Sequence, residues 1–286
     1  MGTLFVVATP IGNLEDITVR ALRVLREATL IAAEDTRTTR KLLAHYRIGT
    51  RLLSYNEHNT RQRTPQLLTA LAEGDIALVS EAGTPGVSDP GHELIVAALE
   101  AGLGVISVPG PSAVIAALTA SGLPMREFTF LGFSPRRAGE RRRALAAVAA
   151  EPRTMVLFEA PHRLRQTLED IRATLGERRI AVCRELTKAF EEVFRGTISE
   201  AISHYAEPRG EFTLVVEGAT GVTSEPGEDA IVRELKQHLS DGVSVRDSAA
   251  QVAAELGVPR RLVYKLSLGL RSATPPKRKG RRPSGP

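Results

Sequence analysis

Cysteine is nearly absent from this sequence, since Cys183 is the only one among 286 residues. A single cysteine excludes an internal disulfide framework and any zinc site built from clustered cysteines. The 6 histidines are scattered rather than set at metal-ligand spacing, so we predict no metal site. A chain without disulfides is typical of the reducing cytoplasm, which is the location that we expect.

Long apolar runs are missing as well. No stretch approaches the ~20 residues that cross a bilayer as a helix, so we expect no membrane contact. Residues 1–12 hold a short apolar run with no basic residue before it, and this does not match a secretory signal peptide.

Three widespread active-site motifs do not occur. No Gly-x-Gly-x-x-Gly follows the first expected strand, and the sequence contains neither Gly-x-x-x-x-Gly-Lys-Ser/Thr nor Gly-x-Ser-x-Gly. Ordinary Rossmann nucleotide binding, P-loop phosphoryl transfer and the hydrolase nucleophile elbow are therefore disfavoured.

The charge is unevenly distributed. The whole chain has a net charge of +5, but 10 of its 38 Lys and Arg and only 3 of its 33 Asp and Glu lie in residues 241–286. Basic side chains drive non-specific affinity for nucleic acid, so this segment is a candidate polyanion-binding element. A solubilising tail is the alternative.

Short apolar runs alternate with amphipathic stretches in residues 1–120, which we interpret as an N-terminal α/β domain. The alternation favours a mainly parallel sheet, because parallel strands need helical crossovers. We expect strands at 4–8, 30–33, 76–80 and 105–108, and helices at 17–26, 38–46, 61–71 and 92–101.

A second α/β domain is predicted over residues 121–220. Two of its strands meet around Glu191 with no room for a helix between them, so the sheet should be mixed. We expect strands at 128–132, 154–158, 179–184, 192–195 and 211–217, and helices at 139–149, 162–175 and 198–205. Residues 221–286 should form a small helical extension with helices at 229–239, 245–256 and 259–268, followed by a disordered basic tail at 274–286.

Three corners rich in Gly and Pro follow expected strands of the first domain. They are residues 8–13, 80–91 and 109–113. In a parallel sheet these corners gather at the carboxyl edge, where open α/β folds bind ligands. Glycine lets a ligand approach the main chain, and the helix that opens at Ser112 offers free N–H groups to a carboxylate. The alternative for any one corner is a tight βα turn.

The ordered motifs of the chain resemble one known family. The motifs are Thr9-Pro10-Ile11-Gly12-Asn13-Leu14, Glu34-Asp35-Thr36-Arg37, His58-Asn59, Ala82-Gly83-Thr84-Pro85-Gly86-Val87-Ser88-Asp89-Pro90-Gly91, Pro109-Gly110-Pro111-Ser112-Ala113, Phe130-Leu131-Gly132-Phe133, Phe158-Glu159-Ala160-Pro161-His162-Arg163, Arg184-Glu185-Leu186-Thr187-Lys188 and Gly210-Glu211. Through them, residues 3–217 resemble the ribosomal small-subunit methyltransferase I family, which 2′-O-methylates a cytidine in the decoding centre of 16S rRNA.

The resemblance implies the tetrapyrrole methylase-like (class III methyltransferase) fold, with S-adenosylmethionine between two α/β domains and commonly a homodimer. It implies cofactor contacts at Pro10, Ile11, Gly12, Glu81, Ala82, Gly83, Thr84, Pro85, Ser112 and Ala113, with a wall at Phe158 and Glu159. Glu81 departs from the family, which usually has Asp there, and its carboxylate sits on a longer arm.

Methyl transfer to a ribose 2′-hydroxyl requires alignment and an acceptor for the hydroxyl proton. We predict Lys188 and Glu185 as base or orienting groups, and a solvated ion pair is the alternative.

The RNA backbone requires basic residues. Arg37 is our candidate phosphate contact, although Glu34–Arg37 also suits a helix cap. His58 and Asn59 fit a substrate loop or a turn, and Arg163 fits the cleft or a cap. Arg136, Arg137 and Arg141 belong to a dense cluster that fits phosphate contact or a solvated face.

Residues 245–265 resemble a helix-turn-helix. Its second helix carries Arg260, Arg261, Tyr264 and Lys265, and we predict that Arg260, Arg261 and Lys265 contact RNA. A small packing module is the alternative.

Two other functions stay open from the residues alone. A methyltransferase of the same fold could act on a small molecule such as a tetrapyrrole, and a non-catalytic ribosome-assembly protein could keep the fold for binding RNA.

Overall fold

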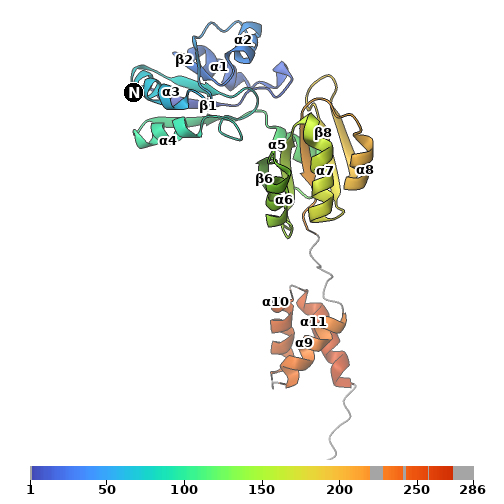
Figure 1. The fold of residues 1–286 in the computed structure, drawn as a ribbon. Helices are drawn as coiled ribbons and strands as arrows, with labels where there is room; N and C mark the ends of the chain where they lie inside the picture. The colour runs from blue at the N-terminus through green and yellow to red at the C-terminus, as the bar shows by residue number, and fades with distance from the viewer. Residues whose placement is uncertain (1, 220–227, 241–242, 257, 273–286) are drawn as a thin grey trace, which may run out of the picture. The chain divides into compact units, whose positions relative to one another are not determined.

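The computed structural model describes residues 2–219, 228–240, 243–256 and 258–272. Two compact units divide the chain, Met1–Ala219 and Thr220–Pro286. The first unit contains two five-stranded sheets, and the second contains helices (Figure 1).

The first sheet is fully parallel, as the alternating pattern predicts. Its strands have the spatial order β3-β2-β4-β1-β5. They are β1 (Thr3–Val7), β2 (Leu30–Ala33), β3 (Leu52–Ser54), β4 (Ile76–Val79) and β5 (Gly104–Val108). The sequence did not predict β3, because its three half-buried residues form no apolar run.

Helices cover both faces of this sheet. Side chains of α1 (Val19–Glu27) and α2 (Thr36–His45) enter one core with Val7, Ile31 and Val79. Side chains of α3 (Thr60–Glu73) and α4 (His92–Glu100) enter a second core with Leu4 and Leu78. Because the connection after β1 uses one face and the connection after β4 the other, these neighbouring strands flank a topological switch point.

The second sheet is mixed, as predicted, with the order β6-β7-β10-β8-β9. Only β6 and β7 run parallel; the other neighbours are antiparallel. The strands are β6 (Phe128–Phe133), β7 (Thr154–Glu159), β8 (Arg179–Arg184), β9 (Glu192–Thr197) and β10 (Phe212–Val216). One face packs against α6 (Ala138–Ala147), α7 (Pro161–Leu175) and α8 (Ile198–His204).

The opposite face of this sheet is covered by α5 (Ala113–Ser121). Val114, Ala117 and Leu118 of this helix share a core with Val156 and Val215 of the second sheet. The break between the two α/β halves therefore falls between β5 and α5, earlier than the boundary at residue 120 that the turn-rich stretch suggested.

The C-terminal unit contains α9 (Glu228–Ser240), α10 (Val245–Glu255) and α11 (Arg260–Ser272). Three helices were predicted here, at closely similar positions. The tail predicted as disordered, 274–286, lies outside the described residues. Within the described part of the chain, no helix has both the length and the apolar character that a bilayer span requires.

Candidate functional site

The three Gly- and Pro-rich corners meet at the carboxyl edge of the first sheet, as predicted. Thr9 and Gly83 exchange two backbone hydrogen bonds, of 2.8 and 3.0 Å. A Cβ placed on Gly83 would lie 3.6 Å from Cγ2 of Ile11 and 4.0 Å from the carbonyl oxygen of Pro111. Residues of the first, second and third corner thus lie within van der Waals distance of one another.

Thr9 carries an unsatisfied polar atom at this junction. Its side chain is buried, and its Oγ1 has no hydrogen-bond partner among the described residues. Buried hydroxyls are normally paired, and an orphaned one marks a position for water or a ligand. In the third corner, Ser112 caps α5 through the N–H of Ile115, while the N–H groups of the first turn have no acceptor within the helix. These groups fit a polar ligand with a carboxylate, such as the amino-acid end of S-adenosylmethionine.

The second corner is shaped by left-handed backbone. Gly83 has φ 76° and Gly86 has φ 83°, conformations that glycine adopts without strain. Ser88 also has φ 65°, which is uncommon for a residue with a side chain. Its Oγ would lie 3.3 Å from a Cβ placed on Gly132 of β6, so this corner reaches the second sheet.

Three carboxylates gather at the second corner, two of them, Glu81 and Asp89, from the corner itself. Glu34 follows β2 and Glu81 follows the adjacent strand β4, and the N–H of Glu81 donates to Oε2 of Glu34 at 3.0 Å. Burial, and then the charge of Glu34, raises the pKa of Asp89 to about 7. Burial also raises the pKa of Glu34.

Sequence reasoning considered Glu34 only as part of the Glu34–Arg37 motif, and it gave Asp89 no role of its own. The available signal was that Glu34 and Glu81 each follow an apolar strand. It predicts a shared acidic site only once β2 and β4 are known to be neighbours. Glu81 itself is exposed, and its longer arm brings Oε1 to 3.4 Å from Oγ1 of Thr38 on α2.

Lys188 is held between two carboxylates. Its Nζ lies 2.9 Å from Oε1 of Glu185 and 2.9 Å from Oε2 of Glu211. Burial lowers the pKa of Lys188, but the hydrogen bonds with Glu211 and Glu185 outweigh it and raise the pKa above its ordinary value. Burial raises the pKa of Glu185, but hydrogen bonds from the backbone N–H of Glu211 and from Nζ of Lys188 outweigh burial, so the pKa lies below its ordinary value. At neutral pH the lysine is a cation, so it suits orientation and charge stabilisation and not proton abstraction.

Local backbone geometry fixes this group. Glu185 and Thr187 have φ of 49° and 67°, and Gly210 lies so close to Glu185 that a Cβ there would be 2.6 Å from Cγ of the glutamate. Uncommon backbone conformations of this kind tend to cluster at functional sites.

The Lys188 segment lies directly against the first corner. A Cβ placed on Gly12 would lie 2.4 Å from Cγ of Lys188, and the N–H of Asn13 donates to Oγ1 of Thr187 at 3.1 Å. A hollow opens here, lined by Gly12, Asn13, Leu14, Glu15, His45, Thr187, Lys188 and Ala189. The first corner, predicted to bind the cofactor, therefore lies beside Lys188 of the predicted catalytic pair.

The prediction that Glu159 forms part of a cofactor wall is wrong for its side chain. The Glu159 carboxylate is fully buried, accepting from Ser134, from Oγ1 of Thr167 at 2.5 Å and from the N–H of Ala160 at 2.7 Å. Arg163 pairs with it at 2.7 Å, and only 15% of the Arg163 side chain is exposed. The guanidinium is therefore mostly committed inside the fold, which corrects its assignment to RNA. Phe158 packs against Phe130 and Phe133.

Arg141 was also predicted to contact RNA, and this is wrong. Its side chain is 3% exposed and donates to Oδ2 of Asp170 through Nε at 2.8 Å and Nη2 at 2.5 Å. Nη1 donates to the carbonyl oxygens of Pro135 and Arg136. A buried, fully engaged guanidinium cannot reach a phosphate.

Comparison with known proteins identifies the family. Residues 3–202 match the model of the tetrapyrrole (corrin/porphyrin) methylases. Ribosomal RNA small subunit methyltransferase I of Halalkalibacterium halodurans is 48% identical over 274 residues, which cover 93% of this chain and 94% of that protein. This chain belongs to the ribosomal RNA small subunit methyltransferase I family.

The family contains shorter members. The enzyme of that name from Thermotoga maritima is 50% identical over 221 residues, which cover 99% of that protein but 76% of this chain. Among solved structures, uroporphyrin-III C-methyltransferase from Thermus thermophilus, complexed with S-adenosyl homocysteine, matches with a TM-score of 0.54 and 21% identity, over 76% of this chain and 97% of that one. That likeness shows the fold alone.

Other residues predicted to bind RNA in this family member are placed at the surface or within turns. The Arg37 side chain is 86% exposed and pairs with Asp35, whose pKa falls to about 2 through its hydrogen bonds with Arg37. Asp35 also caps α2, so the capping interpretation of this motif holds. The side-chain amide of Asn59 bonds to Ser54 and Asn56 inside its turn, while His58 is exposed.

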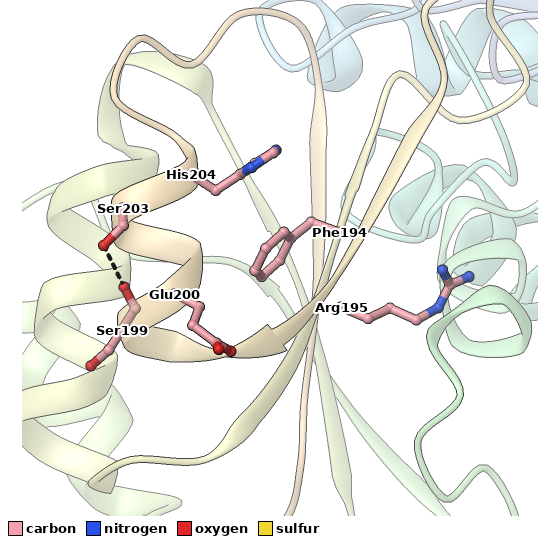
Figure 2. A pocket seen from close by; sticks show the side chains of 6 residues that line it. All are labelled: Phe194, Arg195, Ser199, Glu200, Ser203 and His204. Atoms are coloured by element: carbon pink, nitrogen blue, oxygen red, sulfur yellow. Dashed lines mark hydrogen bonds between the residues drawn. The ribbon is translucent and has the colours of Figure 1, made fainter.

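Arg136 and Arg137 are exposed before and at the start of α6. A further hollow, shown in Figure 2, lies on β9 and α8 and is lined by Phe194, Arg195, Ser199, Glu200, Ser203 and His204. None of the residues predicted to bind cofactor or RNA lines it. Among the described residues, no group of three or more His, Cys, Asp or Glu side chains is placed to hold a metal ion.

Proposed function

We propose that this chain transfers a methyl group from S-adenosylmethionine to the ribose 2′-hydroxyl of a cytidine in the decoding region of 16S rRNA. The observation that carries the proposal is 48% identity to a ribosomal RNA small subunit methyltransferase I over 93% of the chain. The arrangement of the corners supports it, because the first corner lies against Lys188 and within van der Waals distance of the second and third corners.

The residues of the corners suit the cofactor. Backbone groups of Ile11, Gly12 and Thr84, with the N-terminus of α5 after Ser112, offer donors and acceptors at the edge of the sheet. Gly83, whose own backbone groups bond to Thr9, allows close approach of a ligand. Pro10, Ala82, Pro85 and Ala113 shape the loops. When bound, S-adenosylmethionine supplies a methyl group on a sulfonium, which is the activated group in the reaction.

Lys188 orients the acceptor. Its ammonium, fixed by Glu185 and Glu211, lies beside Gly12 and can hold the ribose or a neighbouring phosphate of the RNA. The hydroxyl proton also needs an acceptor within hydrogen-bond reach of the 2′-oxygen. Exposed Arg37, His58, Arg136 and Arg137 supply polar and cationic surface for the RNA backbone.

The proposal includes a homodimer that works in the cytoplasm. Large apolar side chains of the first unit remain exposed, among them Phe133 at 55%, Phe190 at 76% and Met125 at 52%. Exposed apolar side chains favour association where they form a contiguous patch. Light scattering of the purified chain should give twice the mass of one chain.

The test is transfer of labelled methyl from S-adenosylmethionine to small ribosomal subunits from a strain that lacks this modification, followed by nucleotide mapping. Label on a cytidine 2′-oxygen is the expected result. Label on a tetrapyrrole but not on rRNA would replace the proposal with a small-molecule methyltransferase. No binding of S-adenosylmethionine in calorimetry would indicate a non-catalytic RNA-binding protein.

A further inference from the structure

The C-terminal helical unit has a hydrophobic core of its own. Side chains from all three helices are fully buried in it, including Ile231 and Leu235 of α9, Ala249 and Val252 of α10, and Val263 of α11. This core contains no residue of the first unit. The helices are therefore held together by their own packing and can act as a separate module.

One side of α11 carries cations and an aromatic ring. Arg260, Arg261, Tyr264 and Lys265 are exposed, with Tyr264 46% exposed. Residues 260 and 264, and likewise 261 and 265, are four apart, so the four side chains share one side of the helix. Val263 and Ser267 of the same helix are buried. We call these four residues the α11 face.

The charges of the α11 face are not neutralised within the described part of the chain. None of its three cations makes an ion pair with a described carboxylate. Asp247 of α10 is instead bonded to Oγ of Ser244 at 2.6 Å. Arg246 on α10 and Arg233 and Lys236 on α9 are also exposed. Unpaired cations with a ring between them suit a nucleic-acid backbone better than a carboxylate partner inside the protein.

The catalytic fold does not need this module. The Thermotoga maritima relative is matched over 99% of its own length by 76% of this chain, and the uncovered quarter is about the share that Thr220–Pro286 represents. A function for the module should therefore lie in affinity for the substrate and not in the chemistry.

We propose that the α11 face binds the phosphate backbone of the RNA substrate, with Tyr264 stacking on an exposed base or ribose, and so anchors the RNA to the enzyme. The proposal rests on the proposed function for the identity of the nucleic acid. An anchor of this kind lowers KM for the RNA and leaves kcat unchanged, because it binds substrate and transition state equally.

The experiment compares two full-length triple variants that remove equal charge. The test variant is Arg260→Gln, Arg261→Gln and Lys265→Gln. The control is Arg20→Gln, Arg23→Gln and Arg26→Gln, three exposed arginines of α1 in the first unit. Circular dichroism shows whether both variants stay folded. Binding of a 16S rRNA decoding-region fragment is measured by fluorescence anisotropy at several salt concentrations without cofactor.

The test variant should bind RNA about tenfold or more weakly. The slope of the logarithm of its binding constant against the logarithm of the salt concentration should become shallower by about two to three, because each lost phosphate contact reduces that slope by roughly one. Its KM should rise while kcat stays at the wild-type value, and the control should match the wild type in all of these measurements.

Equal weakening in the control would overturn the proposal, because net charge alone would then explain the effect. Unchanged RNA binding in the test variant, with methyl transfer intact, would overturn the anchor but leave the proposed function standing. Tighter binding of the wild-type face to duplex DNA than to RNA would also overturn it. If the wild type neither binds RNA nor methylates it, the proposed function fails as well.

Discussion

Replacing Arg141 by methionine should destabilise the protein strongly without a specific effect on RNA. The side chains of Arg141 and Asp170 are 3% and 6% exposed, and two guanidinium nitrogens share one carboxylate oxygen. Methionine keeps much of the apolar stem but leaves the Asp170 carboxylate buried without a counter-charge. Breaking a buried pair in this way costs about 3–5 kcal/mol.

The matched control is Arg142→Met, on the same helix with an exposed side chain, which should cost no more than about 0.5 kcal/mol. Urea unfolding followed by circular dichroism measures both, since the chain has no tryptophan for fluorescence. The double variant Arg141→Met with Asp170→Leu should recover most of the loss, because no unpaired charge remains buried. A cost below about 1 kcal/mol for Arg141→Met, or weaker RNA binding by this variant while it is still folded, would refute the reasoning.

Three further variants test the site. Gly12→Val should reduce methyl transfer at least about tenfold, because the new Cβ would meet Cγ of Lys188 at 2.4 Å and displace the lysine. The melting temperature without S-adenosylmethionine should change little. Steady-state kinetics and a thermal melt of the cofactor-free protein check both. Lys188→Met should lower kcat about tenfold or more but leave the shape of the pH–rate profile unchanged, since a cation held by two carboxylates is not the group that titrates; a lost alkaline limb would contradict this. For Asp89 the folded pKa of about 7 exceeds the unfolded value of about 4, so the folded protein holds a proton that the unfolded chain releases, and stability falls as pH rises between these values. Asp89→Asn should flatten this slope and be more stable than wild type above pH 7 by about 1–2 kcal/mol, a figure reduced for the solvent that reaches the half-buried carboxyl. The urea midpoints of unfolding of wild type and Asp89→Asn, measured at pH 5 and pH 8, test this. An equal change between the two pH values in both proteins would contradict it.

The carboxyl edge of the first sheet was predictable because its signals are local. Each corner follows an apolar run directly, and parallel strands bring their ends to one edge without any knowledge of strand order. The acidic group of Glu34, Glu81 and Asp89 required that order, since it depends on β2 lying next to β4. A single sequence does not contain this information.

Arg141 and α5 show two other limits. Arg141 lies four residues before buried Leu145 and so on the buried side of α6, a signal that the surrounding run of arginines obscures. The apolar side chains of α5 predict that the helix is buried, but they are equally compatible with either sheet. Its contact with Val156 and Val215 follows from tertiary packing alone.

The location of α5 couples the two halves of the catalytic unit mechanically. Ser112 at its first turn belongs to the predicted cofactor loops, while Val114, Ala117 and Leu118 are embedded in the core of the second sheet. Lys188 also follows a strand of that sheet. A rigid-body displacement of the second sheet must therefore carry Ser112 and Lys188 together, so the third corner and the ammonium group of Lys188 respond to one motion and not to two.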